Sequence, residues 1–282
     1  MIIWLASYPK SGNTWLRALL SAYYFSENGK FNANLLQKID QFPRKFFFTG
    51  FNYKLNSVGS TSNYWINAQE KINNDKKIKF FKTHNSLCVF NNNNFTNSKN
   101  TLGSIYIVRD PRNIITSLKN HFEFDYDEAL KFMLSKNKYT YNQNLVDDFS
   151  DFQFISSWEE HYKSWLNNKI FPIKLVKYED LIYKTYEVFK DVIFFINKIS
   201  NNQNKFDKEK AKNSVNTTSF SKLKNFEKTL GFEEAIVSKK NLKKIPFFNL
   251  GPDNDWKKIL SKESQEKMNI VFENNLKELK YL

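Results

Sequence analysis

The sequence predicts an α/β protein with a three-layer, P-loop-like fold, in which helices flank a central parallel sheet. Short apolar runs alternate with amphipathic helical segments along the 282 residues, which is typical of parallel strands joined by helices. The first apolar run, residues 2–7, breaks into a tight turn, and a helical pattern follows at once. Strand, turn and helix in this order aim backbone N–H groups and the positive end of a helix at an anion.

The other elements are predicted from apolar periodicity and from turn residues. Further strands are expected at residues 77–82, 104–108 and 173–178, and helices at residues 111–121, 158–165, 183–196 and 261–279. The aromatic segment 30–67 is expected to be irregular, and the four asparagines at 91–94 form a loop signal. Nothing resembles an interdomain linker, so we expect a single domain over residues 1–282.

Composition limits the functional classes. Hydrophobic residues make up 41% of the chain, and 28 Phe, 14 Tyr and 6 Trp supply enough surface for a sizeable core. The formal charge of +14 favours anionic partners. Many lysines, however, are dispersed among asparagine-rich stretches such as 73–77 and 201–205. We therefore interpret the charge as solubility plus modest attraction of an anionic ligand, and expect no nucleic-acid partner.

The single cysteine, Cys88, excludes an internal disulfide and a multi-cysteine metal cluster. The N-terminus lacks the basic region of a signal peptide. No apolar run approaches the roughly 18 residues that a membrane span requires. These features predict a reduced, cytoplasmic protein with no membrane span.

The turn after the first strand has the composition of a phosphate-binding loop. Gly12 allows close approach of the backbone, Ser11 and Thr14 offer hydroxyl donors, and Lys10 adds a mobile positive charge. The nucleotide-hydrolysing P-loop needs its Lys after a second Gly, whereas here the Lys precedes the loop's only Gly. An ordinary strand-to-helix turn with a surface Lys is the alternative.

Arg109 marks a second anion site. It follows the strand expected at 104–108, and the carboxyl ends of such strands are where α/β sheets bind ligands. Ser117 follows eight residues later, about two helical turns into the next helix. Arg suits bidentate recognition of phosphate. A surface Arg–Asp pair with an ordinary helix Ser is the alternative.

A candidate base follows another strand. His84 ends the sequence Lys82-Thr83-His84, and its unperturbed pKa near 6.5 suits proton transfer. A lone His is more often structural. His121 and His161 compete poorly for this role, because His161 shares an aromatic helix face and His121 ends the helix after Arg109. His121 is expected to be structural, and a role near the ligand is its alternative.

Taken together, these motifs resemble the sulfotransferase family. Tyr-Pro-Lys-Ser-Gly-Asn-Thr-Trp, residues 8–15, is similar to the family's 5′-phosphosulfate loop and differs only by Asn13 in place of Thr. An Asn side chain can also bond a phosphate oxygen. Arg109 and Ser117 match the family's 3′-phosphate site, and Lys82-Thr83-His84 matches the segment whose His takes the acceptor's proton.

Weaker matches follow in the family's order along the chain. The resemblance implies that Trp15 stacks on the adenine and that further contacts to it come from Tyr178, Thr218, Ser219 and Phe220. Gly251 belongs to a late segment that resembles one in the family. Asn249-Leu250 stand where the family usually has Arg-Lys, and Asn254 stands where the family has Gly. Nearby lysines are candidate substitutes for the lost charges: Lys243, Lys244, Lys257 and Lys258.

The resemblance implies a sulfotransferase that uses 3′-phosphoadenosine 5′-phosphosulfate as donor and needs no metal. It implies that His84 deprotonates the acceptor, that Lys10 stabilises the leaving 5′-phosphate, and that Lys82 assists at the sulfonate. The acceptor would be a hydroxyl or amine of a small molecule, glycan, lipid or peptide. Its pocket is expected near residues 42–65, Phe124 and Tyr126, although Phe-rich stretches are more often core.

Two other classes stay open. A P-loop-type nucleotide kinase or hydrolase shares the strand–loop–helix arrangement, but the position of Lys10 and the missing second Gly disfavour it. A basic nucleic-acid-binding protein would explain the charge, but the lysines are dispersed and no recognised nucleic-acid module is apparent.

Overall fold

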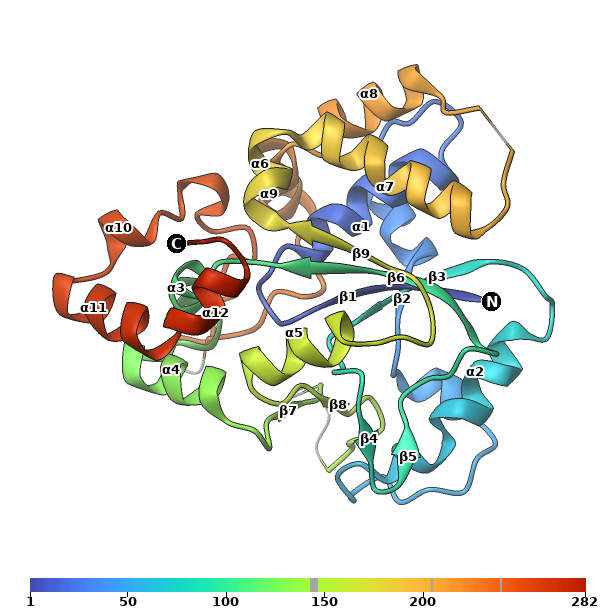
Figure 1. Ribbon diagram of the computed structural model, residues 1–282, viewed down its shortest axis with the longest axis horizontal. Coiled ribbons are helices and arrows are strands. Elements are labelled where there is room, and N and C mark those ends of the chain that lie inside the picture. The colour runs from blue at the N-terminus through green and yellow to red at the C-terminus, as the bar shows by residue number, and fades with distance from the viewer. Residues whose placement is uncertain (143–146, 204, 239) are drawn as a thin grey trace.

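A five-stranded sheet forms the centre of the molecule (Figure 1). The computed structural model describes residues 1–282 except 143–146, 204 and 239. The strand order is β2-β3-β1-β6-β9, and every pairing between neighbours is parallel. The strands are β1 (Ile2–Ser7), β2 (Asp40–Gln41), β3 (Lys79–Thr83), β6 (Thr101–Val108) and β9 (Ile173–Lys177). The predicted α/β fold with a central parallel sheet is confirmed.

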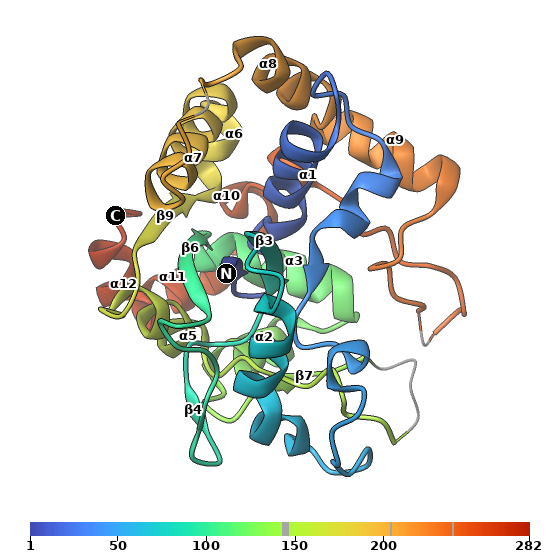
Figure 2. The same cartoon turned by 90° about the vertical axis from the view of Figure 1, so that its right-hand side faces the viewer.

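Strand β1 is buried along its whole length, because helices cover both faces of the sheet. Its side chains alternate between two cores. Ile3 and Leu5 pack on one side and Trp4 and Ala6 on the other. The first core contains residues of α1 (Asn13–Phe25), α6 (Tyr178–Tyr183), α7 (Thr185–Ile199) and α8 (Lys208–Thr217). Figures 1 and 2 show these helices together on one side of the sheet.

The second core is larger and more aromatic. Trp4 contacts the rings of Phe42, Phe81 and Phe95, and its indole N–H donates to Thr101 Oγ1 over 2.9 Å. The helices on this side are α2 (Trp65–Asn73), α3 (Pro111–Phe122), α4 (Tyr126–Leu134), α5 (Trp158–Leu166), α11 (Lys262–Val271) and α12 (Glu273–Glu278). Much of the aromatic segment 42–65 is therefore core.

Short elements complete the chain. They are the 3-10 helices η1 (Ala33–Lys38), η2 (Lys45–Phe48), η3 (Ser60–Tyr64) and η4 (Gly251–Asp253), the hairpins β4 (Val89–Phe90) with β5 (Asn93–Asn94) and β7 (Tyr139–Thr140) with β8 (Gln153–Phe154), and the helices α9 (Phe220–Leu230) and α10 (Trp256–Ile259). Of the loop expected at 91–94, Asn91 and Asn92 form the tight turn of the β4–β5 hairpin, both at positive φ, whereas Asn93 and Asn94 form strand β5. In the described part of the chain, no helix has both the length and the apolarity needed to cross a membrane.

Several predicted boundaries were wrong, and β6, for example, begins at Thr101 and not at residue 104. The last helix, expected over 261–279, is divided at Phe272, where the backbone leaves helical geometry at φ −109° and ψ 16° while the ring is buried. The helix expected from Tyr183 starts at Thr185, because Lys184 at φ −135° separates α6 from α7. Helices α2, α4, α6, α8, α9 and α10 were not predicted. In α8 and α9 the apolar residues are few and widely spaced, whereas α4 is largely apolar but has only nine residues.

A buried ion pair at the start of α3 is hydrogen-bonded to the C-terminal segment. Asp110 accepts hydrogen bonds from the backbone N–H and the guanidinium of Arg112, with a closest distance of 2.7 Å. Arg112 also donates to Asn269 Oδ1 and to the carbonyl of Tyr281. Both charged side chains are almost fully buried, at 4% and 6% exposure. Each side chain therefore offsets the free-energy cost of burying the charge of the other.

We expect Arg112→Ala to lower the free energy of unfolding by about 3 kcal/mol, because it leaves the Asp110 carboxylate buried without its cation. Urea denaturation measures this difference. The control is Lys267→Ala, which breaks the exposed pair between Lys267 and Asp127 and should change stability little. Equal losses in the two variants would contradict the structural role given to Arg112.

Candidate active site

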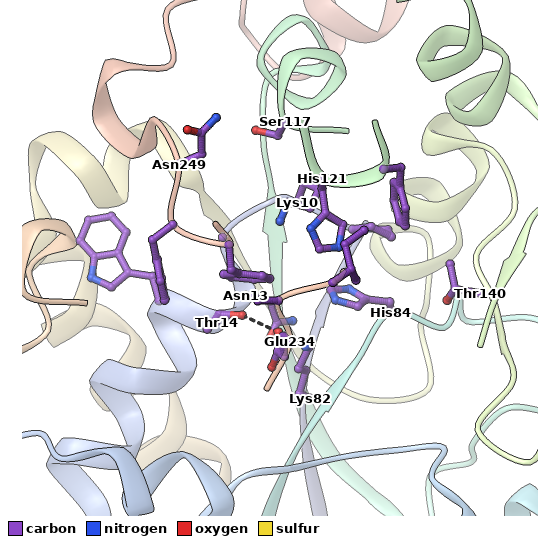
Figure 3. Close-up of a pocket in the computed structure, with 18 of the residues that line it drawn as sticks. Lys10, Asn13, Thr14, Lys82, His84, Ser117, His121, Thr140, Glu234 and Asn249 are labelled. Atoms are coloured by element: carbon purple, nitrogen blue, oxygen red, sulfur yellow. Dashed lines mark hydrogen bonds and ion pairs between the residues drawn. The ribbon is translucent and has the colours of Figure 1, made fainter. Parts of the chain in front are cut away.

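The carboxyl ends of the central strands open into a cavity of about 650 Å³, a size ordinary for a small-molecule site. Its lining includes loop residues that follow β1, β3 and β6. Figure 3 shows Lys10, His84 and His121 around the same hollow, with Thr14 and Lys82 facing Glu234. Residues far apart in the sequence thus meet at one edge of the sheet, as expected for parallel strands.

The loop after β1 has a backbone shape that only certain residues allow. Lys10 lies at φ 66° and Gly12 at φ 97°, both in the left-handed region. A Cβ on Gly12 would lie 2.3 Å from the Tyr178 ring, so this position has no space for a side chain. Gly12 precedes α1 without a side-chain cap. The first N–H groups of the helix are therefore not used by a capping side chain and can serve an anion.

The Asn13 side chain is used within the protein. Its Nδ2 donates to the carbonyl of Leu5 over 2.8 Å and to Ser7 Oγ over 3.2 Å, both on β1. The sequence suggested that this side chain bonds a phosphate oxygen, but its amide already donates within the protein. Asn13 can therefore serve a ligand through its backbone N–H. Ser11 is buried and does not line the cavity, and its hydroxyl has no partner among the described residues.

Arg109 connects the ends of β1 and β6. Its Nη1 donates to the carbonyl of Lys10 over 2.9 Å and to Ser117 Oγ over 3.2 Å. The guanidinium lies 4.3 Å from the centre of the Tyr178 ring. Arg109, Ser117, Lys10 and Tyr178 all line the cavity. The two anion sites predicted from separate motifs therefore belong to one cavity.

Asn254, which stands where the resemblance expects Gly, connects α3 with the segment before α10. Its Nδ2 donates to Ser117 Oγ over 3.1 Å and to the carbonyl of Asn113, and its Oδ1 accepts from Thr116. Asn249, Leu250 and Gly251 line the cavity. The lysines suggested as substitutes for Arg-Lys are absent from its described lining: Lys243, Lys244, Lys257 and Lys258. The suggestion that they replace the missing charges stays a prediction.

Trp15, Tyr178 and Phe220 are among the aromatic residues that line the cavity. Trp15 and Tyr178 meet edge to face at 6.0 Å, and Phe220 packs so closely against Gly251 that a Cβ there would lie 2.3 Å from the ring. Thr218 and Ser219 do not line the cavity. The Thr218 hydroxyl is buried and donates to the carbonyl of Ser214.

His84 has a defined tautomer. Its Nδ1 lies 2.7 Å from the carbonyl oxygen of Ser7, which can only accept, so Nδ1 carries the hydrogen and Nε2 keeps the lone pair. The Gln153 side chain accepts from the backbone N–H of His84. Burial and the charge of Lys82 lower the pKa of His84 to about 3. The ring is thus neutral at physiological pH, with its lone pair on Nε2, but at this pKa it is a weak base.

The other histidines differ from each other. His161 is fully buried, as expected, and its Nε2 donates to the His84 carbonyl over 3.0 Å while its Nδ1 meets the hydroxyl of Tyr106. His121, expected to be structural, lines the cavity and packs against Phe247. Its Nδ1 is buried without a partner among the described residues. Burial and the charge of Lys10 lower the pKa of His121 to about 3.

The two lysines of the site are strongly desolvated. Burial lowers the pKa of Lys10 to about 7, and its ammonium lies 3.9 Å from the centre of the Phe247 ring. Burial also lowers the pKa of Lys82, while the carboxylate of Glu234, 2.7 Å from its Nζ, opposes that shift. An anion bound beside either lysine would stabilise the charged form.

Two site residues were missed by sequence reasoning. Glu234 follows α9, and its carboxylate contacts Arg17, Lys82 and Thr14. Arg17 lies one helical turn after Thr14 on α1, a spacing that signals a shared face. No local signal identified Glu234. Within the described chain, no group of three or more His, Cys, Asp or Glu side chains could hold a metal ion.

Comparisons with known proteins agree with this geometry. Residues 2–280 match the model of the sulfotransferase domain. A rabbit (Oryctolagus cuniculus) amine sulfotransferase is 24% identical over 284 residues, which cover 98% of this chain and 81% of that protein.

Solved structures share the fold. A mouse sulfotransferase complexed with PAP has a TM-score of 0.58 at 19% identity, over 98% of this chain and 84% of that one. Retinol dehydratase in complex with androsterone and inactive cofactor PAP has a TM-score of 0.60 at 14% identity, over 98% and 80%. Because the family model covers nearly the whole chain, the protein belongs to the sulfotransferase family.

Proposed function

We propose that this sulfotransferase moves a sulfonate from 3′-phosphoadenosine 5′-phosphosulfate to a hydroxyl or amine of a small molecule. The observation that carries the proposal is the hydrogen bond between Arg109 and the Lys10 carbonyl. It joins two cationic sites at one cavity, and such a pair suits a nucleotide with anionic groups at both its 5′ and 3′ ends. His84, with its free Nε2, lines the same cavity.

In this proposal the donor lies along the sheet edge. The loop at 10–15 holds the 5′-phosphosulfate, and Arg109 with Ser117 holds the 3′-phosphate. The adenine lies among Trp15, Tyr178 and Phe220, whose flat rings suit stacking on a base. Thr218 and Ser219, which the resemblance assigns to adenine, would act through the placement of Phe220, since they begin the turn before it.

The chemistry is an in-line displacement. The acceptor oxygen or nitrogen forms a bond to sulfur while the bond from sulfur to the 5′-phosphate oxygen breaks. His84 Nε2 takes the acceptor proton, Lys10 stabilises the leaving phosphate oxygen, and Lys82 neutralises charge on the sulfonate. Positioning and fixed charges supply most of the rate in reactions of this kind.

The acceptor is proposed to be a small molecule because the cavity is of small-molecule size. The name of the rabbit relative makes amines the first acceptors to screen. Phe124 lines the cavity and is a candidate acceptor contact, whereas Tyr126 does not line it. A panel of amines and alcohols with radiolabelled donor identifies the class. A single catalytic domain over 1–282 and a cytoplasmic location stay predictions.

His84→Ala should lower turnover on the order of 10²-fold or more, because it removes the general base, while affinity for adenosine 3′,5′-bisphosphate is retained. Steady-state kinetics and calorimetry measure the two quantities. The control is His121→Ala, which removes the other cavity histidine. If His121→Ala abolishes turnover and His84→Ala does not, the base is wrongly assigned.

Arg109→Ala should weaken binding of adenosine 3′,5′-bisphosphate by roughly 10- to 100-fold, the value of a charge-assisted hydrogen bond, and weaken adenosine 5′-monophosphate much less. Calorimetry of both nucleotides gives the comparison. Arg44→Ala, which removes another arginine of the cavity wall, one paired with Asp40, is the control and should change neither. Equal losses for both nucleotides would remove Arg109 from the 3′ site.

Binding of the bisphosphate at pH 8 should take up nearly one proton. Lys10, with a pKa of about 7, is mostly neutral at pH 8 in the empty protein, and a bound anion restores its charge. The ligand's phosphates, with a pKa of about 6, are already ionised. Calorimetry in two buffers of different ionisation enthalpy measures the uptake.

Lys10→Arg provides the control for proton uptake, because Arg is charged in both states. It should bind without uptake, and its affinity should fall less than that of the unmodified protein as pH rises above 7. Equal uptake in the two proteins would show that another group titrates.

A further inference from the structure

A carboxylate occupies the centre of the cationic cluster. Glu234 Oε1 lies 2.6 Å from Arg17 Nη1, and Glu234 Oε2 lies 2.7 Å from Lys82 Nζ and 3.1 Å from Thr14 Oγ1. The partners come from α1 and β3, whereas Glu234 follows α9. Figure 3 shows this carboxylate between Thr14 and Lys82, with the contact to Thr14 drawn. Both carboxylate oxygens are therefore bound.

Two of these partners, Thr14 and Lys82, are also assigned to the donor in the proposed function. Thr14 belongs to the loop proposed for the 5′-phosphosulfate, and Lys82 is proposed to neutralise the sulfonate. A phosphosulfate and a carboxylate carry the same sign, so they repel each other and cannot share these donors at hydrogen-bond distance. The position of Glu234 therefore coincides with that expected for the 5′ anionic end of the donor.

The charge of the cluster explains why an internal anion is present. Lys10, Arg17, Lys82 and Arg109 all line one cavity, and burying such charges without a partner is costly. Burial would raise the pKa of Glu234, but the charges of Lys82 and Arg17 outweigh it and hold that pKa well below its usual range. The carboxylate is therefore ionised and acts as the counter-ion of Arg17 and Lys82.

The Arg17 side chain is also held by hydrogen bonds that do not involve Glu234. Its Nε and Nη2 donate to the carbonyl of Leu36 over 3.3 and 3.0 Å. Only Nη1 is used by the carboxylate. The side chain is 12% exposed. When Glu234 leaves, the guanidinium still points at the position that the carboxylate held.

We propose that Arg17, Lys82 and Thr14 form a subsite for the 5′ anionic group of the donor, which the Glu234 carboxylate fills until the donor replaces it. This inference rests on the proposed function. It adds Arg17 to the donor-binding residues and makes Glu234 a competitor of the donor. Binding then exchanges one anion for another.

Calorimetry with two nucleotides tests the exchange. Glu234→Gln should bind adenosine 3′,5′-bisphosphate about tenfold more tightly than the unmodified protein, because a neutral amide competes less well for charged donors. Adenosine 3′-monophosphate, which lacks the 5′ group, should show no gain. The matched control is Glu233→Gln, at the exposed neighbouring carboxylate, which should bind both nucleotides as the unmodified protein does.

A double variant tests Arg17 itself. In the Glu234→Gln background, Arg17→Gln should weaken the bisphosphate about tenfold and leave the 3′-monophosphate unchanged. Using this background removes the direct effect of losing the pair between Arg17 and Glu234. Equal weakening of both nucleotides would indicate distortion of α1 and would remove Arg17 from the subsite.

The outcomes separate the two proposals. If the unmodified protein does not bind the bisphosphate, the proposed function fails. If it binds but Glu234→Gln binds no more tightly, the exchange is overturned, and Glu234 then holds Lys82 and Arg17 in the loaded enzyme. Should Glu234→Gln not fold, Glu234→Asp retains the charge on a shorter side chain and should show a smaller gain in bisphosphate affinity, and no gain would again overturn the exchange.

Discussion

The hydrogen bond from Arg109 to the carbonyl of Lys10 is the contact on which the site depends. It forms because β1 and β6 are parallel neighbours whose carboxyl ends lie together. The left-handed backbone of Lys10 and Gly12 shapes the loop that presents this carbonyl. This bond thus fixes the distance between Arg109 and the loop at 10–15, and in the proposed function that distance would determine which nucleotide fits the cavity.

Placing several cations together in a buried site costs electrostatic free energy, and the pKa values of the site lysines show this cost. The desolvated lysines have lowered pKa values, as Lys10 and Lys82 do, and Glu234 limits this loss of charge. Such a cluster is stable only with an anion in it, whether that anion belongs to the protein or to the ligand. If a ligand anion replaces the Glu234 carboxylate, as proposed, its affinity is the difference between its own interaction with these cations and that of the carboxylate.

The sequence alone predicted the features that depend on residues close together in the chain. Strands β1 and β6 were predicted as apolar runs because both of their faces are buried, and the motifs around Lys10 and Arg109 each span fewer than ten residues. The partner of Arg17 is 217 residues away, at Glu234, and no periodicity reports such a contact. The division of the last helix at Phe272 was missed for a similar reason, since tertiary burial of one ring overrides a continuous helical pattern.

The exchange of anions would also prepare the base. Burial and the charge of Lys82 keep His84 neutral but make it a poor proton acceptor. A phosphosulfate brings more negative charge to the cluster than one carboxylate. Nearby negative charge favours the imidazolium and raises the pKa of a histidine toward the value at which a general base is most effective. Donor binding would therefore increase the basicity of His84 before an acceptor gives up its proton, which favours transfer only when the sulfonate is present.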